Sequence, residues 1–279
     1  MRFAAALRET AVTDASGANR LVRVDRPDNG VVLITLALPH RRNTMTAEMT
    51  AAWTESVARL RGDRSVRCVV VTGEGRAFCA GGDIGWIGAE PEKSVDQLRD
   101  RMLRFYRAWL SIRDLDVPTI AAINGPAVGA GLCLAMACDL RYATPEAALS
   151  VPFTSLGMHP GMAATWLLPE IVGLPVAREL FFTGRRLTGA EAVGLGLVNG
   201  VFPSETLVAD VLSVAATVAA QAPQAVRLTK VALAAGGPAS IESALQWESL
   251  AQPITLATAD LQEGLRAASE RRRPNFTGD

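Results

Sequence analysis

Two continuous apolar segments, each ending in a glycine-rich turn, constrain the fold of this chain most strongly. The segments are RCVVVTG (residues 67–73) and VPTIAAING (residues 117–125), and neither alternates polar with apolar residues. Strands of this kind are buried on both faces, as in parallel sheets that helices cover. Helical patterns alternate with such strands along the chain, so we expect an α/β core in which helices pack on buried strands.

The sequence before the first of these segments predicts a hairpin and a helix. Strand-like runs at residues 21–25 and 31–38 are separated by RPDNG, and the Asn-Gly pair in it is a strong signal for a hairpin turn. A helix is predicted from Thr46, which can cap it, to about Arg61, because apolar residues recur there at three- and four-residue steps.

Downstream of the second segment we expect helices at residues 130–138 and 162–172, with short strands in LRYAT and AALSV between them. After LVNGVF the pattern becomes almost wholly helical, interrupted only at proline- and glycine-containing breaks. We therefore divide the chain into a flexible N-terminal arm (1–19), a core (20–203) and a C-terminal helical region (204–279).

Composition excludes several classes of function. The chain has 279 residues, and its 28 Lys and Arg balance its 28 Asp and Glu, so no net charge attracts nucleic acid or an acidic membrane. No apolar run approaches the ~20 residues of a membrane span, and residues 1–10 lack the apolar stretch of a secretory signal. The four cysteines match no metal-binding spacing, so we expect no metal and reduced thiols in a cytoplasmic protein.

The two glycine-rich turns are the candidate functional elements. They are GEGRAFCAGGDI (residues 73–84) and NGPAVGAGL (residues 124–132), and each directly follows a predicted strand. Small side chains let a ligand approach the main chain closely, and a helix that begins at Ala130 would direct its positive dipole end at an anion. Two N–H groups that converge on one oxygen form an oxyanion hole. Neither turn has the pattern of a phosphate loop or a dinucleotide site, and each alone is also typical of a purely structural turn.

Taken together, the two turns resemble the crotonase (enoyl-CoA hydratase/isomerase) superfamily. GRAFCAGGDI is similar to its first oxyanion motif and INGPAVGAGLCLAMACDLRYAT to its second. The likeness extends over almost the whole chain, through the segments LPHRRNTM, LGMHPG, LFFTGRRLTGAEAVGLGLVNGV and EGLRAASERRRPNFTGD. The resemblance implies a repeated ββα spiral core with a C-terminal helical trimerisation region, assembled as a homotrimer or a dimer of trimers.

The resemblance also implies a binding site for an acyl-CoA. The backbone N–H groups of Gly82 and Ala130 would hold the thioester oxygen. His40 and Arg41 would reach the phosphates of coenzyme A, which enters as part of the substrate, with no permanently bound cofactor. The slot for adenine and pantetheine would be lined by Ala80, Gly82, Asp83 and Ile84, and the acyl pocket by Trp86 and Phe153.

The sequence departs from the family at each position where members carry a catalytic acid. Alignment places Cys133 and Phe153 at the two glutamates of the hydratases, and Gly161 at the aspartate of the hydrolase and dehalogenase members. General acid–base groups each contribute ~100- to 10,000-fold to a rate. We therefore expect acyl-CoA binding and enolate stabilisation to persist while ordinary hydration is weak.

Other residues could replace the missing acids. His159 could act as a general base, a role that histidine side chains often take near neutral pH, although a histidine beside a Pro-Gly turn also suits a structural role. Cys133 lies in the first turn of a helix, where the pKa of a thiol can fall, or it is a small buried hydrophobic residue. A polar segment at 85–98 is expected to cover the acyl group, and Glu90, Glu92 or Asp96 in it could swing inward.

Three functions follow from these observations. In the first interpretation the chain is an enzyme of the enoyl-CoA hydratase/isomerase type, a lyase or isomerase of fatty acid metabolism. Alternatively, it catalyses another acyl-CoA reaction, such as decarboxylation, thioester hydrolysis or C–C cleavage, with help from His159. In the third interpretation it binds acyl-CoA without catalysis.

Overall fold

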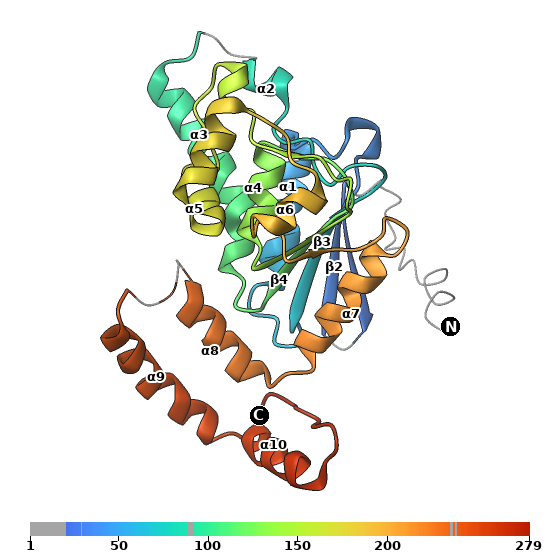
Figure 1. The fold of residues 1–279 in the computed structure, drawn as a ribbon, viewed down its shortest axis with the longest axis vertical. Helices are drawn as coiled ribbons and strands as arrows, with labels where there is room; N and C mark the ends of the chain where they lie inside the picture. The colour runs from blue at the N-terminus through green and yellow to red at the C-terminus, as the bar shows by residue number, and fades with distance from the viewer. Residues whose placement is uncertain (1–20, 29, 89–91, 235–236, 238) are drawn as a thin grey trace.

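A six-stranded sheet runs through the body of the molecule, and we describe it from a computed structural model of the chain (Figure 1). The structure describes residues 21–28, 30–88, 92–234, 237 and 239–279; the expected N-terminal arm lies outside these residues. The strand order is β1-β2-β3-β4-β6-β8, in which β1 and β2 form an antiparallel hairpin and all other neighbours are parallel. The strands are β1 (Val22–Asp28), β2 (Val31–Leu36), β3 (Cys68–Gly73), β4 (Thr119–Ile123), β6 (Leu140–Ala143) and β8 (Gly200–Val201).

The central strands are buried on both faces, as their continuous apolar sequences predict. Every residue of β3 and β4 is buried. Val69 and Val71 of β3 face one part of the core, whereas Cys68 and Val70 face the other. The α/β class predicted from the sequence is therefore confirmed, with helices on both faces of a largely parallel sheet.

The larger part of the core lies on the face covered by α1 (Ala47–Leu60), α3 (Val95–Leu110) and α4 (Ala130–Ala137). Helix α1 begins where the sequence predicts, because the Thr46 hydroxyl accepts a hydrogen bond from the N–H of Met49 (3.1 Å). Two buried tryptophans join α1 to α3: the rings of Trp53 and Trp109 stack with centroids 5.1 Å apart. This packing fixes α3 against the body of the molecule.

The opposite face of the sheet is covered by α7 (Leu207–Ala219). Its buried residues are Leu207, Val211, Ala215 and Ala219, four residues apart, so they form one stripe against the sheet. Within the described residues no single helix is long and apolar enough to cross a membrane. Helices α7 and α8 meet that criterion only as a pair bent by 104°.

Three further helices leave the body at the C-terminal end: α8 (Pro223–Leu233), α9 (Ile241–Leu256) and α10 (Ala259–Glu270) (Figure 1). Basic side chains attach α8 to the body, since Lys230 pairs with Asp139 (2.8 Å) and Arg227 with Asp116 (3.3 Å). The division at residue 203 remains a prediction about domains. In the structure α7 packs on the sheet, and the helices that leave the sheet begin with α8.

Helix α5 (Ala164–Thr183) extends beyond the predicted range of 162–172. It breaks at Gly173, whose φ of 76° and ψ of 159° are not helical, and continues from there toward Gly184. Because glycine and proline usually end a helix, the sequence around Gly173 and Pro175 predicts a stop rather than a bend. The remaining elements are short: α2 (Ile84–Gly88), α6 (Gly189–Gly194) and a second two-stranded sheet of β5 (Ala127–Val128) and β7 (Leu149–Ser150).

Asn43 connects the turn after β2 to the loop after β3. Its side-chain oxygen accepts a hydrogen bond from the N–H of Leu38 (2.9 Å), and its amide donates to the carbonyls of Glu74 (3.0 Å) and Ala77 (2.8 Å). The side chain is fully buried. Asn43 therefore satisfies three backbone groups and fixes the course of the first glycine-rich loop.

Replacing Asn43 by alanine is expected to lower the free energy of unfolding by roughly 3 kcal/mol. Each buried backbone group left without a partner costs about 1–3 kcal/mol. Urea denaturation followed by circular dichroism measures the loss. The matched control is Asn275→Ala at an exposed position, where a change within about 0.5 kcal/mol is expected. Equal stability of the two variants would contradict this account.

Candidate functional site

Two loops that follow adjacent parallel strands lie side by side at the carboxyl ends of those strands. The first follows β3 and the second follows β4, and these strands pair in parallel. Cys79 of the first loop pairs in parallel with Ala127 of the second. The N–H of Cys79 donates to Pro126 O (3.2 Å), and the N–H of Val128 donates to Cys79 O (3.0 Å). The two glycine-rich turns found in the sequence are thus brought together.

Glycine is required where these loops touch. A methyl group on Gly81 would lie 2.5 Å from the carbonyl oxygen of Val128 and 3.3 Å from the nitrogen of Ala130. A methyl group on Gly131 would lie 2.1 Å from the carbonyl oxygen of Cys79. No side chain fits at either position without moving the backbone, so the absence of side chains allows the main chain of the first loop to reach the start of α4.

The N–H groups of Gly82 and Ala130 are free at this contact. Each residue lies three positions beyond the paired residues Cys79 and Ala127, and Ala130 is the first residue of α4. Among the described residues neither N–H has a hydrogen-bond acceptor, although the neighbouring Gly129 N–H donates to Ser150 O (2.9 Å). Free backbone donors beside a helix N-terminus suit an oxygen that gains negative charge.

The residues expected to contact coenzyme A also lie together. His40 and Arg41 belong to a short 3-10 helix (Pro39–Arg41), and both are exposed. Arg41 Nη2 pairs with Asp83 Oδ2 at 2.9 Å, and the Ala80 N–H donates to the carbonyl of Arg42 (3.0 Å). A basic turn therefore borders the loop that carries Gly82. Ile84 begins α2, but the side chains of Ile84 and Trp86 lie outside the described residues.

The three positions that lack acids gather near the start of α4. The ring of Phe153 faces Gly129, since a methyl group there would lie 3.7 Å from Phe153 Cζ. Cys133 Sγ lies 3.8 Å from the carbonyl oxygen of Gly161. A phenyl ring, a thiol and a bare backbone thus surround the space where the resemblance would place carboxylates.

Cys133 does not have the lowered pKa that its place in the first turn of a helix suggests. The side chain is fully buried, and burial raises the pKa of its thiol to about 12. The free energy cost of a buried thiolate exceeds the benefit of the helix dipole here. Cys133 therefore stays a neutral thiol at physiological pH, in agreement with the alternative of a small buried hydrophobic residue.

His159 lies at the surface. Its ring is exposed, and Nδ1 is 2.8 Å from the carbonyl oxygen of Pro160. That contact is local to the turn, because the two residues are neighbours in sequence. Of the other candidate acids, Glu92 and Asp96 are exposed, whereas Glu90 lies outside the described residues.

Tyr106 enters this region without having been predicted as a site residue. The sequence places it on the apolar face of α3, where core packing is the ordinary role. In the structure a methyl group on Gly161 would lie 2.5 Å from its hydroxyl oxygen and 2.9 Å from Cζ. The phenol thus fills the space of a side chain at residue 161. Only the contact between α3 and the turn before α5, 55 positions apart, reveals this.

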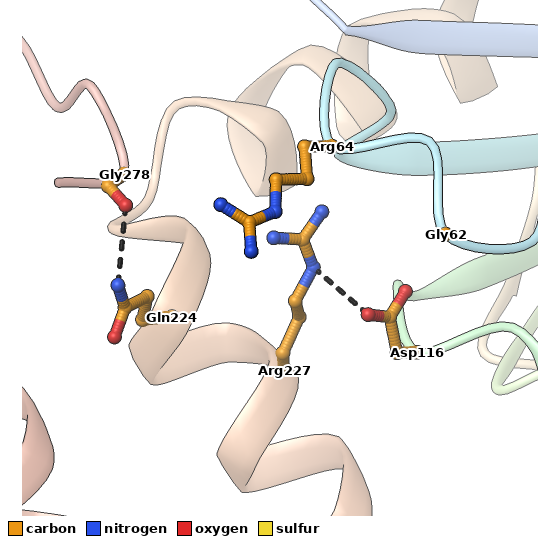
Figure 2. Close-up of a pocket in the computed structure, with 6 residues that line it drawn as sticks. All are labelled: Gly62, Arg64, Asp116, Gln224, Arg227 and Gly278. Carbon is orange, nitrogen blue, oxygen red and sulfur yellow. Dashed lines mark hydrogen bonds and ion pairs between the residues drawn. The ribbon is translucent and has the colours of Figure 1, made fainter.

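A separate cavity of about 310 Å³ lies where α8 and the C-terminal residues meet the turn before β3. Figure 2 shows the guanidinium groups of Arg64 and Arg227 beside one another, with Arg227 paired to Asp116. The amide of Gln224 donates to the carbonyl of Gly278 (3.2 Å). This cavity shares no residue with the glycine-rich loops, and it marks the joint between the C-terminal helices and the body.

Comparison with known proteins finds a matching family and similar relatives. The family model described as enoyl-CoA hydratase/isomerase matches residues 26–279. A Bos taurus protein named enoyl-CoA hydratase domain-containing protein 2, mitochondrial, is 38% identical over 262 residues, which cover 91% of this chain and 86% of that protein.

Solved structures show the same fold. The crystal structure of an enoyl-CoA hydratase from Bacillus anthracis superposes with a TM-score of 0.87 at 33% identity, covering 93% of this chain and all of that one. An enoyl-CoA hydratase from Mycobacterium smegmatis gives a TM-score of 0.84 at 31% identity, covering 92% of this chain and 98% of that one.

All four cysteines should resist alkylation in the folded protein. Each is buried, and burial raises the pKa of each thiol to about 12. Mass spectrometry after iodoacetamide treatment at pH 7.5 is expected to find no modified cysteine, and four after denaturation in urea. Rapid modification of Cys133 in the folded protein would restore it as a candidate nucleophile.

Proposed function

The chain belongs to the enoyl-CoA hydratase/isomerase family, and on that premise we propose that it binds acyl-CoA thioesters and stabilises their enolates between the N–H groups of Gly82 and Ala130. The observation that carries this proposal is the pair of free backbone donors at the contact between the two loops. An enolate places its charge on the thioester oxygen, and preorganised donors bind that charge more tightly than they bind the neutral carbonyl.

The surroundings of the loops support the orientation of this ligand. Arg41 has further N–H groups besides the one that pairs with Asp83, and these are available to the phosphates of coenzyme A. The acyl end would then lie toward Phe153 and Cys133, whose surface is apolar. This orientation places the charged part of the ligand at the exposed turn and the acyl group at the buried end.

We propose that hydration of an enoyl-CoA is weak in this protein. Adding water across a double bond needs a group that activates the water and one that protonates the α-carbon. Phe153 and Gly161 have no titratable proton, and the pKa of Cys133 is raised. The contacts of His159 do not favour the alternative in which it supplies the base. In this proposal the chain keeps the binding site of the family but lacks the acid–base groups of its hydratases.

Acetoacetyl-CoA tests enolate stabilisation without requiring turnover, because its enolate absorbs ultraviolet light and its α-carbon is acidic. The protein should lower the pKa of the bound ligand. Ala130→Pro removes one donor, and proline is tolerated at the first position of a helix. The equilibrium constant for enolate formation in the bound ligand should then fall roughly 100-fold, which is the effect expected for one oxyanion donor.

The matched control is Ala259→Pro, the same substitution at the first residue of α10, which is exposed and lies among the C-terminal helices away from α4 (Figure 1). Circular dichroism of both variants verifies folding. Crotonyl-CoA hydration should be at least ~100-fold slower than in a hydratase that retains both glutamates. A normal hydration rate, or an unshifted pKa of bound acetoacetyl-CoA, would contradict the proposal.

We further propose that the protein acts in the cytoplasm as a homotrimer or a dimer of trimers. Helix α9 has no buried residue in the single chain. Large apolar side chains are exposed along α8 and α9, among them Ile241 (81% exposed) and Leu250 (68% exposed). Apolar surface of this extent on one helix pair suits contact with another copy of the chain.

Light scattering should give a mass of three or six times 29.5 kDa. Leu250→Glu should reduce this mass, because a buried unpaired carboxylate is costly in an apolar interface. Val95→Glu is the control, since Val95 is also an exposed apolar residue (81% exposed) and lies at the start of α3. A monomer in the unmodified protein would rule out this assembly.

A further inference from the structure

The hydroxyl group of Tyr106 lies where the family's third acid position would extend. Gly161 occupies that position, and the space beside its Cα is filled from α3 by the phenol. A methyl group on Gly161 would be 2.5 Å from the hydroxyl oxygen, which is shorter than any non-bonded contact with carbon. The glycine and the tyrosine are therefore complementary: a side chain at residue 161 would displace the hydroxyl.

The hydroxyl is close to the other substituted position as well. Cys133 Sγ contacts the carbonyl oxygen of Gly161, and Cys133 acts electrostatically on Tyr106. Among the described residues the Tyr106 hydroxyl has no hydrogen-bond partner, and the side chain is partly rather than fully buried. A free hydroxyl group thus lies beside two of the three positions that lack acids, Gly161 and Cys133.

The protonation state of Tyr106 limits what it can do. Burial raises the pKa of the phenol above its ordinary value, and the neighbouring Cys133 raises it further. The group therefore stays protonated through neutral pH, so it can give a proton but cannot accept one. The site has an acid and an oxyanion hole but lacks a base among the three substituted positions.

We propose that Tyr106 is the proton donor of this site and that its substrates are malonyl-type thioesters, which lose CO₂. This inference rests on the enolate-binding function proposed above. Loss of CO₂ forms an enolate without removal of a proton, so the reaction needs no base. The apolar surface of Phe153 and Cys133 also favours the reaction, because an unpaired carboxylate is costly in such surroundings and neutral CO₂ is not.

Decarboxylation would form the enolate first, and protonation of its α-carbon would follow. The bond between the α-carbon and the carboxylate carbon breaks, and CO₂ leaves. The electron pair of that bond forms the enolate, whose oxygen is held by the N–H groups of Gly82 and Ala130. The Tyr106 hydroxyl then transfers its proton to the α-carbon, and the phenolate regains a proton from water. One carboxylate thioester and one proton become one acyl thioester and CO₂.

Methylmalonyl-CoA in D₂O is the probe, because its product carries one deuterium on a carbon with four different substituents. The unmodified protein should release CO₂ and deliver the deuterium to a single face. Tyr106→Phe should slow the reaction by ~100-fold or more and abolish the stereospecificity, with the acyl-CoA affinity changed less than threefold. Gly161→Ala should give a similar loss by displacing the phenol, and the double variant should lose no more than either single one.

The matched control is Tyr142→Phe, the same change at the other tyrosine of the chain, which packs against Phe202 on the α7 side of the sheet. Its rate and stereochemistry should be unchanged. A stereospecific reaction in Tyr106→Phe at the original rate would overturn the role of Tyr106. Tight binding of methylmalonyl-CoA without CO₂ release would overturn the reaction class, whereas failure to bind any acyl-CoA would overturn the underlying proposed function.

Discussion

The parallel pairing of Cys79 with Ala127 is the interaction on which the rest of the site depends. It aligns two loops that leave adjacent strands, and it brings Gly81 against the carbonyl of Val128. Glycine at 81 and 131 permits this approach, and the side chain of Asn43 holds the loop after β3 by hydrogen bonds to its backbone. Because these contacts are made by backbone, the positions of the N–H groups of Gly82 and Ala130 do not depend on any titratable side chain.

A site built from backbone can keep its binding chemistry while its side chains change. Cys133 and Phe153 stand where the resemblance places glutamates, yet the pairing of the loops does not involve their side chains. The new side chains still alter the site, because a thiol and a phenyl ring stand at the positions where the resemblance places carboxylates. The proposal made for Tyr106 assigns the role of proton donor to a hydroxyl group from another element, α3.

Local patterns predicted much of this structure. The buried strands, the hairpin and the Thr46 cap depend on residues near one another in sequence, and all three are found. The continuation of α5 beyond the break at Gly173 was missed because glycine and proline end a helix more often than they bend one. Of the two alternatives for Cys133 the structure favours the buried thiol, and the sequence could not decide between them because position in a helix is local, whereas burial is a property of the whole fold. Tyr106 was missed because its partner, Gly161, has no side chain to give a signal.

Isotope-edited infrared spectroscopy of a bound acyl-CoA with a ¹³C-labelled thioester carbonyl tests the central claim most directly. Two backbone donors on the carbonyl oxygen weaken the C=O bond, so its stretching frequency should fall below the value in water. The shift should be smaller in Ala130→Pro, which keeps only one donor. A carbonyl frequency equal to that of free acyl-CoA in water would show that the N–H groups of Gly82 and Ala130 do not bind the thioester oxygen.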